Sequence, residues 1–246
     1  MATSTKNFFC SPQFILGLAI IISAVVFSYS FYSSRSNADT ISVTGSASQE
    51  VVSDSAKFSG SFSRIVKLNS LKTGYEQMAN DLKIFKEFLK QQNIDEKDVI
   101  ISTVSMEQNY DYNQNGVSAA DRDYTLRQNV EIVSGDVNKI ASLAQGVQAL
   151  INRGVIFSVW PVEYYYKKLP ETRVALLSQA VADAKKRAEE ITRGTGQKVG
   201  ALKSASSGVV QVLPANSLEI SDYGAYDTSR LNKSIMVTVK AAFELR

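Results

Sequence analysis

The chain has 246 residues, with 27 Lys and Arg against 24 Asp and Glu, one Cys and no His. This length allows one large domain or two small ones, and an apolar content of 44% is typical of a folded protein. Without His, the chain cannot build a Ser-His-Asp triad, a Cys-His pair or a histidine metal site. We therefore predict no catalytic residue, and the composition favours a structural or binding protein over an enzyme.

The amino-terminal segment is almost free of charge. Residues 1–13 form a short polar end, and residues 14–32 are apolar enough to predict a helix that would nearly cross a hydrocarbon core of ~30 Å. Residues 33–40 are small and polar, as expected of a linker.

Two interpretations of this segment remain open. It is either an uncleaved transmembrane anchor, with residues 1–13 in the cytoplasm, or a signal peptide that is cleaved after Ala38. The first places a single-pass protein in the inner membrane with its carboxy-terminal domain in the periplasm. The second gives a soluble periplasmic protein. In both cases the residues after about 39 are exported.

Strands and a helix are predicted next. Alternation of apolar and polar residues predicts strands over residues 41–51 and 56–63, with a turn at Ser53 and Asp54. A three-four spacing then predicts a long amphipathic helix that ends at Asn93. Its expected buried face consists of Leu68, Leu71, Tyr75, Met78, Leu82, Phe85 and Leu89.

The middle of the chain indicates a hairpin followed by a short helix. Residues 99–112 and 124–132 are predicted to be two strands joined by a long loop with turn residues. Asp136 is placed to cap a helix over residues 137–147.

The second half begins with a predicted strand over residues 156–166, which is interrupted at Pro161. Pro170 then opens a second long helix, and Gly194 follows its end. The apolar face expected for this helix consists of Val174, Leu177, Val181, Ala184, Ala188 and Ile191.

The carboxy-terminal part is predicted to be mostly strand. Residues 199–213 indicate one bent strand or two short ones, and residues 235–245 alternate cleanly between apolar and polar. Between them, residues 214–233 have the composition of a long exposed loop.

This order of elements defines the expected fold class. Strand-helix-strand-strand occurs twice, which predicts a pseudo-duplicated α+β domain with mainly antiparallel sheet. One N-terminal transmembrane or signal helix precedes this domain.

Several short segments, taken together, resemble the SIMPL-domain family over residues 41–246. They are Ile41-Ser42-Val43-Thr44-Gly45, the turn from Asn93 to Val99, Tyr110-Asp111-Tyr112, the helix segment from Ala180 to Glu189, and the ending Phe243-Glu244-Leu245.

The resemblance implies an exported protein of the bacterial cell envelope, of the periplasmic or outer-membrane immunogenic type. It also implies an α+β fold that is prone to form homo-oligomers, and a loose association with oxidative or envelope stress. No catalytic or cofactor-binding residues are established for the family, so the resemblance assigns none here.

A partial calcium-loop pattern occurs at Asp111, Asn113 and Asn115. A complete loop of this kind needs a carboxylate at its twelfth position, which here is Arg122. The segment also lies between two predicted strands, so a hairpin turn is the better interpretation, and we predict no metal and no cofactor.

Aromatic and basic residues were the other candidates. Trp160 with the run from Tyr164 to Lys168 could stack on bases or sugars, although strand alternation would bury part of the run. Lys185 to Arg187 is followed by two glutamates and is typical of a solvated helix face. Lys6 and Arg35 supply most of the small positive excess, so nucleic acid is not an expected partner.

The sequence therefore predicts a non-enzymatic envelope protein that acts by oligomeric assembly or protein interaction. Its expected partners are further copies of itself, the membrane through its first helix, and an envelope protein. The alternative is a periplasmic module that binds a small ligand or a cation through the loops at residues 111–123 and 214–233.

Overall fold

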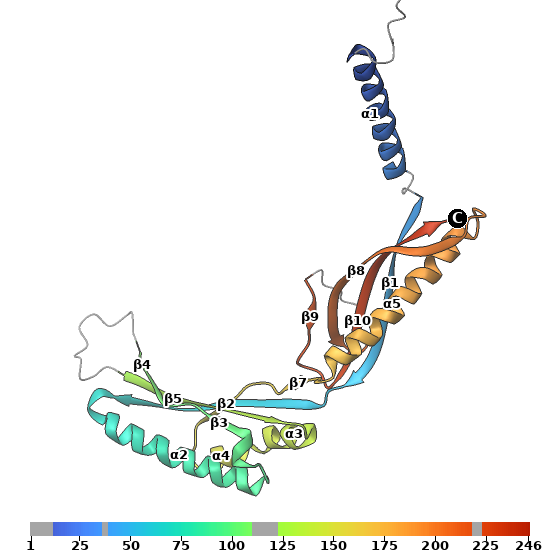
Figure 1. The fold of residues 1–246 in the computed structure, drawn as a ribbon. Coiled ribbons are helices and arrows are strands. Elements are labelled where there is room, and N and C mark those ends of the chain that lie inside the picture. Colours follow the sequence, from blue (N-terminus) through green and yellow to red (C-terminus); the bar gives the residue numbers. More distant parts are fainter. Residues whose placement is uncertain (1–11, 36–38, 110–122, 218–222) are drawn as a thin grey trace, which may run out of the picture. The chain divides into compact units, whose positions relative to one another are not determined.

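The computed structural model describes residues 12–35, 39–109, 123–217 and 223–246 (Figure 1). It is an α+β fold with two mostly antiparallel sheets, as predicted. Its elements are α1 (Pro12–Arg35), β1 (Thr40–Val52), β2 (Ser55–Lys67), α2 (Leu71–Gln91), β3 (Val99–Ile101), β4 (Ser105–Gln108), β5 (Asp123–Ser134), α3 (Val137–Gly146), α4 (Gln148–Asn152), β6 (Phe157–Val159), β7 (Glu163–Tyr165), α5 (Leu169–Thr192), β8 (Val199–Pro214), β9 (Ala225–Tyr226) and β10 (Asn232–Leu245), with 3-10 turns at Leu68–Ser70 and Glu96–Asp98.

Contacts divide the chain into two compact units. Unit 1 consists of Met1–Ser46, Gln179–Gly208 and Thr238–Arg246, and unit 2 consists of Ala47–Ser178 and Val209–Val237. One sheet has the strand order β1-β10-β8-β9, and the other has the order β3-β5-β2-β6, with β4 paired to β5 and β7 paired to β2.

The predicted amino-terminal helix is present as α1. Its side chains from Leu16 to Tyr32 are almost all exposed. Among the described residues, no helix combines the length and the hydropathy that crossing a membrane requires.

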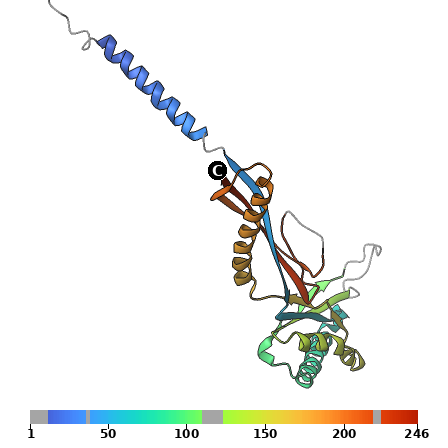
Figure 2. The ribbon, with the colours of Figure 1, turned by 90° about the vertical axis from the view of Figure 1, so that its right-hand side faces the viewer.

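The core of unit 2 lies between the sheet around β2 and the helices α2, α3 and α4, which cover one face of that sheet (Figure 2). Phe157 on β6 stacks on Phe85 of α2, with ring centroids 5.4 Å apart, and on Phe58 of β2 at 6.1 Å. Phe62 packs against both Phe85 and Phe157. Gly60 leaves room for this cluster, because a Cβ at this position would overlap the Phe157 ring.

The buried face of α2 is rotated from the predicted one. Met78, Phe85 and Leu89 are buried as expected, but Leu68 and Tyr75 are about two-fifths exposed, at 41% and 42%. Leu68 lies in the 3-10 turn before the helix, so it does not continue the helical face. Gly74, Asp81 and Phe88 are buried instead.

The buried carboxylate of Asp81 is paired with Arg64 on β2. The guanidinium donates two hydrogen bonds to it, at 2.8 Å from Nε and 2.7 Å from Nη2. This geometry is the two-pronged form that makes Arg–carboxylate pairs strong, and it accounts for a charged residue on the inner side of α2.

The strand predicted over residues 99–112 is wrong as a single element. β3 and β4 both pair with β5, but the chain leaves the ladder between them. There the carbonyl of Ser102 accepts a hydrogen bond from the side chain of Gln128, and its hydroxyl accepts one from the Asn129 N–H. The Asn129 N–H is therefore bonded to the Ser102 hydroxyl and not to its carbonyl, which interrupts the regular ladder between β3 and β4. Residues 110–112 lie outside the described residues.

Two other predictions in unit 2 are confirmed. Asp136 caps α3, because its carboxylate accepts the N–H of Lys139 at 3.0 Å. The strand interrupted at Pro161 is present as β6 and β7, which both pair with β2.

The long exposed loop predicted over residues 214–233 is only partly correct. It contains β9, which pairs in parallel with β8, and it ends at Lys233, which is fully buried. The Lys233 ammonium donates to the carbonyls of Asp227 and Arg230 and lies 3.5 Å from the Asp227 carboxylate. Burial lowers the pKa of Lys233, against the opposing effect of Asp227.

In unit 1, α5 packs closely on β1. Gly45 permits this approach, because a Cβ there would overlap the Ala180 carbonyl and the backbone of Ala184. The Asp183 carboxylate accepts the N–H of Ser46 at 2.8 Å and pairs with Arg187, four residues later, also at 2.8 Å. Near the end of α5, Arg193 pairs with Glu190, three residues earlier.

The buried face of α5 also differs from the predicted one. In unit 1 it follows a strict spacing of four residues, with Ala180, Ala184, Ala188 and Thr192 buried. Ile191 and Val174, which were expected inside, are 61% and 69% exposed. Small side chains face the sheet because they allow close contact, and the larger aliphatic ones are left outside.

The turn predicted at Ser53 and Asp54 does not form a hairpin. β1 and β2 belong to different sheets, and the Ser53 N–H donates to the carbonyl of Leu231.

The strand predicted over residues 235–245 is confirmed as β10, with Ile235, Val237 and Val239 among its buried residues. The pseudo-duplication of the domain stays a prediction.

Gly45 provides a test of the packing in unit 1. We expect Gly45→Ala to lower the free energy of unfolding by about 2 kcal/mol, because the methyl group would meet backbone atoms that cannot move aside cheaply. Gly194→Ala is the matched control, since its Cβ would meet nothing within 4 Å. Urea unfolding followed by circular dichroism measures both. Equal unfolding free energies for the two variants would contradict the proposed contact.

Candidate functional site

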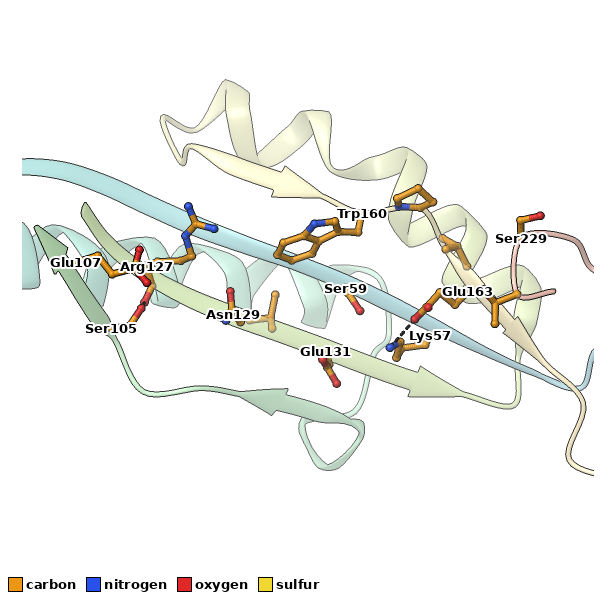
Figure 3. A pocket seen from close by; sticks show the side chains of 14 residues that line it. Lys57, Ser59, Ser105, Glu107, Arg127, Asn129, Glu131, Trp160, Glu163 and Ser229 are labelled. Atoms are coloured by element: carbon orange, nitrogen blue, oxygen red, sulfur yellow. Dashed lines mark hydrogen bonds and ion pairs between the residues drawn. The ribbon is translucent and has the colours of Figure 1, made fainter. Parts of the chain in front are cut away.

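The main candidate site is the open face of the sheet in unit 2. Because side chains alternate along β2, the residues between its core positions point to the opposite face. There, side chains from β2, β4, β5 and the β6–β7 connection line a cavity of about 720 Å³ (Figure 3). This volume is within the range of small-molecule sites in proteins.

Trp160 is the one large aromatic side chain in the cavity lining, and it is 44% exposed. Trp160 follows β6 directly, and its backbone N–H donates to the carbonyl of Ser59 at 3.0 Å. Pro161 comes next and has a fixed φ. The backbone of Trp160 is therefore held on β2, and its ring lies across the strand in Figure 3.

Polar side chains of β5 extend the site beside Trp160. Arg127, Asn129 and Glu131 are exposed on this face, and they pair in register with Ser63, Ser61 and Ser59 of β2, respectively. Figure 3 shows Arg127 and Asn129 on the same side of the sheet as the indole ring of Trp160, where all three line the cavity.

Charge at the other end of the cavity is neutralised by an ion pair. The ammonium of Lys57 lies 2.5 Å from the Glu163 carboxylate. The hydrogen bond to Glu163 raises the pKa of Lys57 above 10.5, although burial opposes this shift. Burial and the nearby Glu163 also raise the pKa of Tyr165.

The second candidate surface is the sheet in unit 1. Here β10 is the inner strand, and β1 and β8 lie on either side of it. A groove of about 530 Å³ lies between β1 and α5 and is lined by Val43 and Thr44 from the strand, and by Arg187 and Ile191 among the helix residues. On the other side, residues 201–208 of β8 are exposed on both faces.

One group of sequence candidates lies in a part of the chain that the structure does not describe. Asp111, Asn113 and Asn115 lie outside the described residues, as does Arg122, and the described part contains no group of three metal-ligating side chains. The expectation that this segment forms a hairpin turn and binds no calcium therefore stays a prediction.

The tyrosine run does not form a platform with Trp160. Tyr164 packs against the core of unit 2, whereas Tyr166 packs against a second buried cluster and contacts the Thr172 hydroxyl at 3.2 Å. Tyr165 stacks on Tyr226, with ring centroids 6.1 Å apart. All three are half-buried, so they contribute to packing.

Sequence reasoning found Trp160 but missed its neighbours. Arg127, Asn129 and Glu131 lie in the strand predicted over residues 124–132, to which no role was assigned. The signal for their role is the sheet face that they share with Ser59. That signal depends on the register between β2 and β5, which a sequence pattern does not supply.

These features define a class of protein: an α+β fold whose described surfaces offer a polar cavity and open sheet edges for binding. A match to a family model identifies the family of this chain. Residues 41–242 match SIMPL, described as a protein of unknown function (DUF541), and the chain belongs to this family, as its sequence motifs predicted. No match was found among curated proteins.

The Lys57–Glu163 pair predicts a pH effect. A raised folded-state pKa means that the contribution of charged Lys57 to stability is fully present below pH 10.5 and is lost as the pH rises through that pKa. We expect the wild type to lose unfolding free energy faster than Glu163→Gln above pH 10.5, since this variant removes the largest cause of the shift.

Urea unfolding at a series of alkaline pH values measures this difference. Glu107→Gln is the control, because Glu107 lines the same cavity at its other end. Its curve should run parallel to that of the wild type. A Glu163→Gln curve that is also parallel would show that the pair does not act as described.

Proposed function

We propose that this SIMPL-domain protein is exported to the bacterial cell envelope and acts without catalysis, by assembling with further copies of itself. The observation that carries the proposal is the open edge of β8 in unit 1. Among the described residues, β8 pairs with β10 along one side and meets β9 only at Gln211 and Val212.

The composition of this edge favours pairing with another strand. An exposed strand edge presents unpaired N–H and C=O groups, and proteins usually protect such edges with charges, Pro or bulges. Residues 201–208 carry a single charge, at Lys203, and are otherwise Leu, Ala, Ser and Gly. A strand of small residues exposed on both faces can approach a second strand closely.

The other edge of the same sheet offers a matching acceptor. β1 has β10 on one side only, and the groove beside it is lined by apolar Val43 and Ile191. We propose that β8 of one copy pairs with β1 of the next, and that Leu202, which is 46% exposed, enters this groove. Such a head-to-tail contact between different surfaces generates rings or filaments.

The export part of the proposal rests on the first 38 residues. The apolar side chains of α1 are exposed in the described chain. This exposure supports a segment that inserts into a membrane or is recognised by a secretion apparatus. An anchored protein and a cleaved periplasmic one are both compatible with this. A role in tolerance of envelope stress follows from the family resemblance only.

Light scattering after size-exclusion chromatography tests the assembly. We expect the wild type to form an oligomer of several copies. The double variant Ser204→Lys/Ser206→Lys should dissociate at protein concentrations at least about tenfold higher than the wild type does, because two added charges oppose edge pairing. The matched control is Ala79→Lys/Gln91→Lys, which adds the same charge to exposed positions of α2. A monomeric wild type at high concentration, or equal dissociation of both variants, would refute the proposal.

The mass of the protein isolated from its native membrane fraction tests the export segment. Retention of residues 1–38 would establish the anchor, and a chain that begins at Asp39 would establish cleavage. Recovery of the full-length protein from the cytosol alone would contradict export altogether.

A further inference from the structure

We infer that the cavity on the open sheet face of unit 2 is a carbohydrate site, in which Trp160 stacks on a pyranose ring of an uncharged glycan. Ligand binding in this cavity is independent of the proposed assembly, which uses other surfaces. It rests on the chemistry of the cavity lining and on how Trp160 is held.

A sugar ring needs two kinds of contact. Its axial C–H groups form a weakly apolar face, which packs on a flat aromatic side chain, and its hydroxyls need hydrogen-bonding groups around the rim. Trp160 supplies a flat ring that is 44% exposed. Asn129 offers both a donor and an acceptor, Arg127 offers donors, and Glu131 offers acceptors.

The backbone that carries these groups is fixed before a ligand binds. Asn129 and Glu131 lie two residues apart on β5, so their side chains share one face at a regular spacing. Trp160 is held by its hydrogen bond to Ser59 and by the Phe157 packing three residues earlier. A rigid site loses little conformational entropy on binding, which matters for a ligand that forms individually weak contacts.

The charge of the lining indicates an uncharged sugar. Lys57 and Glu163 neutralise each other, which leaves one cation, Arg127, against the two carboxylates of Glu107 and Glu131 in the lining. A polyanion such as nucleic acid or a sulfated glycan would meet net negative charge here. A neutral ring meets both donors and acceptors here.

The same lining argues against a protein interface at this place. Interface centres are depleted of charged residues, whereas five charged side chains line this cavity: Lys57, Glu107, Arg127, Glu131 and Glu163. The apolar contribution is limited to Trp160, Pro161 and the two valines. A hydroxyl-rich ligand satisfies this mixture better than an apolar patch would.

The chain offers a direct probe, because Trp160 is its only tryptophan. The full-length protein is titrated with chitotetraose, cellotetraose or maltotetraose, and with a heparin tetrasaccharide as the anionic comparison, while Trp160 emission is recorded. We expect a saturable change in emission with at least one neutral tetrasaccharide and a weaker response to heparin.

Variants assign the binding to the site. Asn129→Ala should raise the dissociation constant about fivefold through lost hydrogen bonds, whereas Asn80→Ala, at an exposed position of α2, should leave it unchanged. Trp160→Ala, measured by titration calorimetry, should weaken binding at least about tenfold. Circular dichroism confirms that each variant is folded. If Trp160→Ala does not fold, Trp160→Phe takes its place, and a smaller but clear loss of affinity is expected.

Three results would overturn the inference. They are a flat response to all the neutral sugars, tighter binding of heparin than of any of them, and a Trp160 emission that changes with protein concentration alone, which would place the site at a contact between copies. None of these results decides whether β8 and β1 assemble, since light scattering on the β8 variants measures that separately.

Discussion

The packing of Phe157 against Phe58, Phe62 and Phe85 is the interaction on which unit 2 depends. It joins the short strand β6 to β2 and presses α2 onto the same face of the sheet. Gly60 makes it possible, because any larger residue would occupy the space of the ring. Large side chains meeting at one point in a close-packed core leave little freedom to the strands that carry them.

That constraint also builds the candidate site. Once Phe157 is fixed in the core, strand alternation and the break at Pro161 place Trp160 on the opposite face. β2 thus supplies the core with Phe58 and the cavity with Ser59, one residue later. In unit 1 the same principle operates through Gly45, where the absence of a side chain lets α5 lie against β1.

Sequence patterns predicted the elements better than their faces. The alternation of β2, β5 and β10 was predicted correctly, because a period of two leaves only two possible faces. The two long helices were located, but Tyr75 and Ile191 were assigned to the wrong side. The buried face of a helix can be rotated by any angle, so periodicity alone does not fix it. A charged group such as Asp81 is buried only because a partner, Arg64, is available from another element.

The sequence by itself determined the α+β class, the helix at the amino terminus and the lack of histidine chemistry, since these depend on composition and local periodicity, and it indicated the family through the resemblance of several short segments. Tertiary structure alone decided which strands pair and in what register. That register places Asn129 and Glu131 on the same sheet face as Trp160. In the other sheet, strand pairing leaves β1 at one edge, and among the described residues it leaves β8 without a neighbour on its outer side before Gln211. The physical reason is that pairing joins residues far apart in the chain, and their choice of partner depends on how the whole core packs.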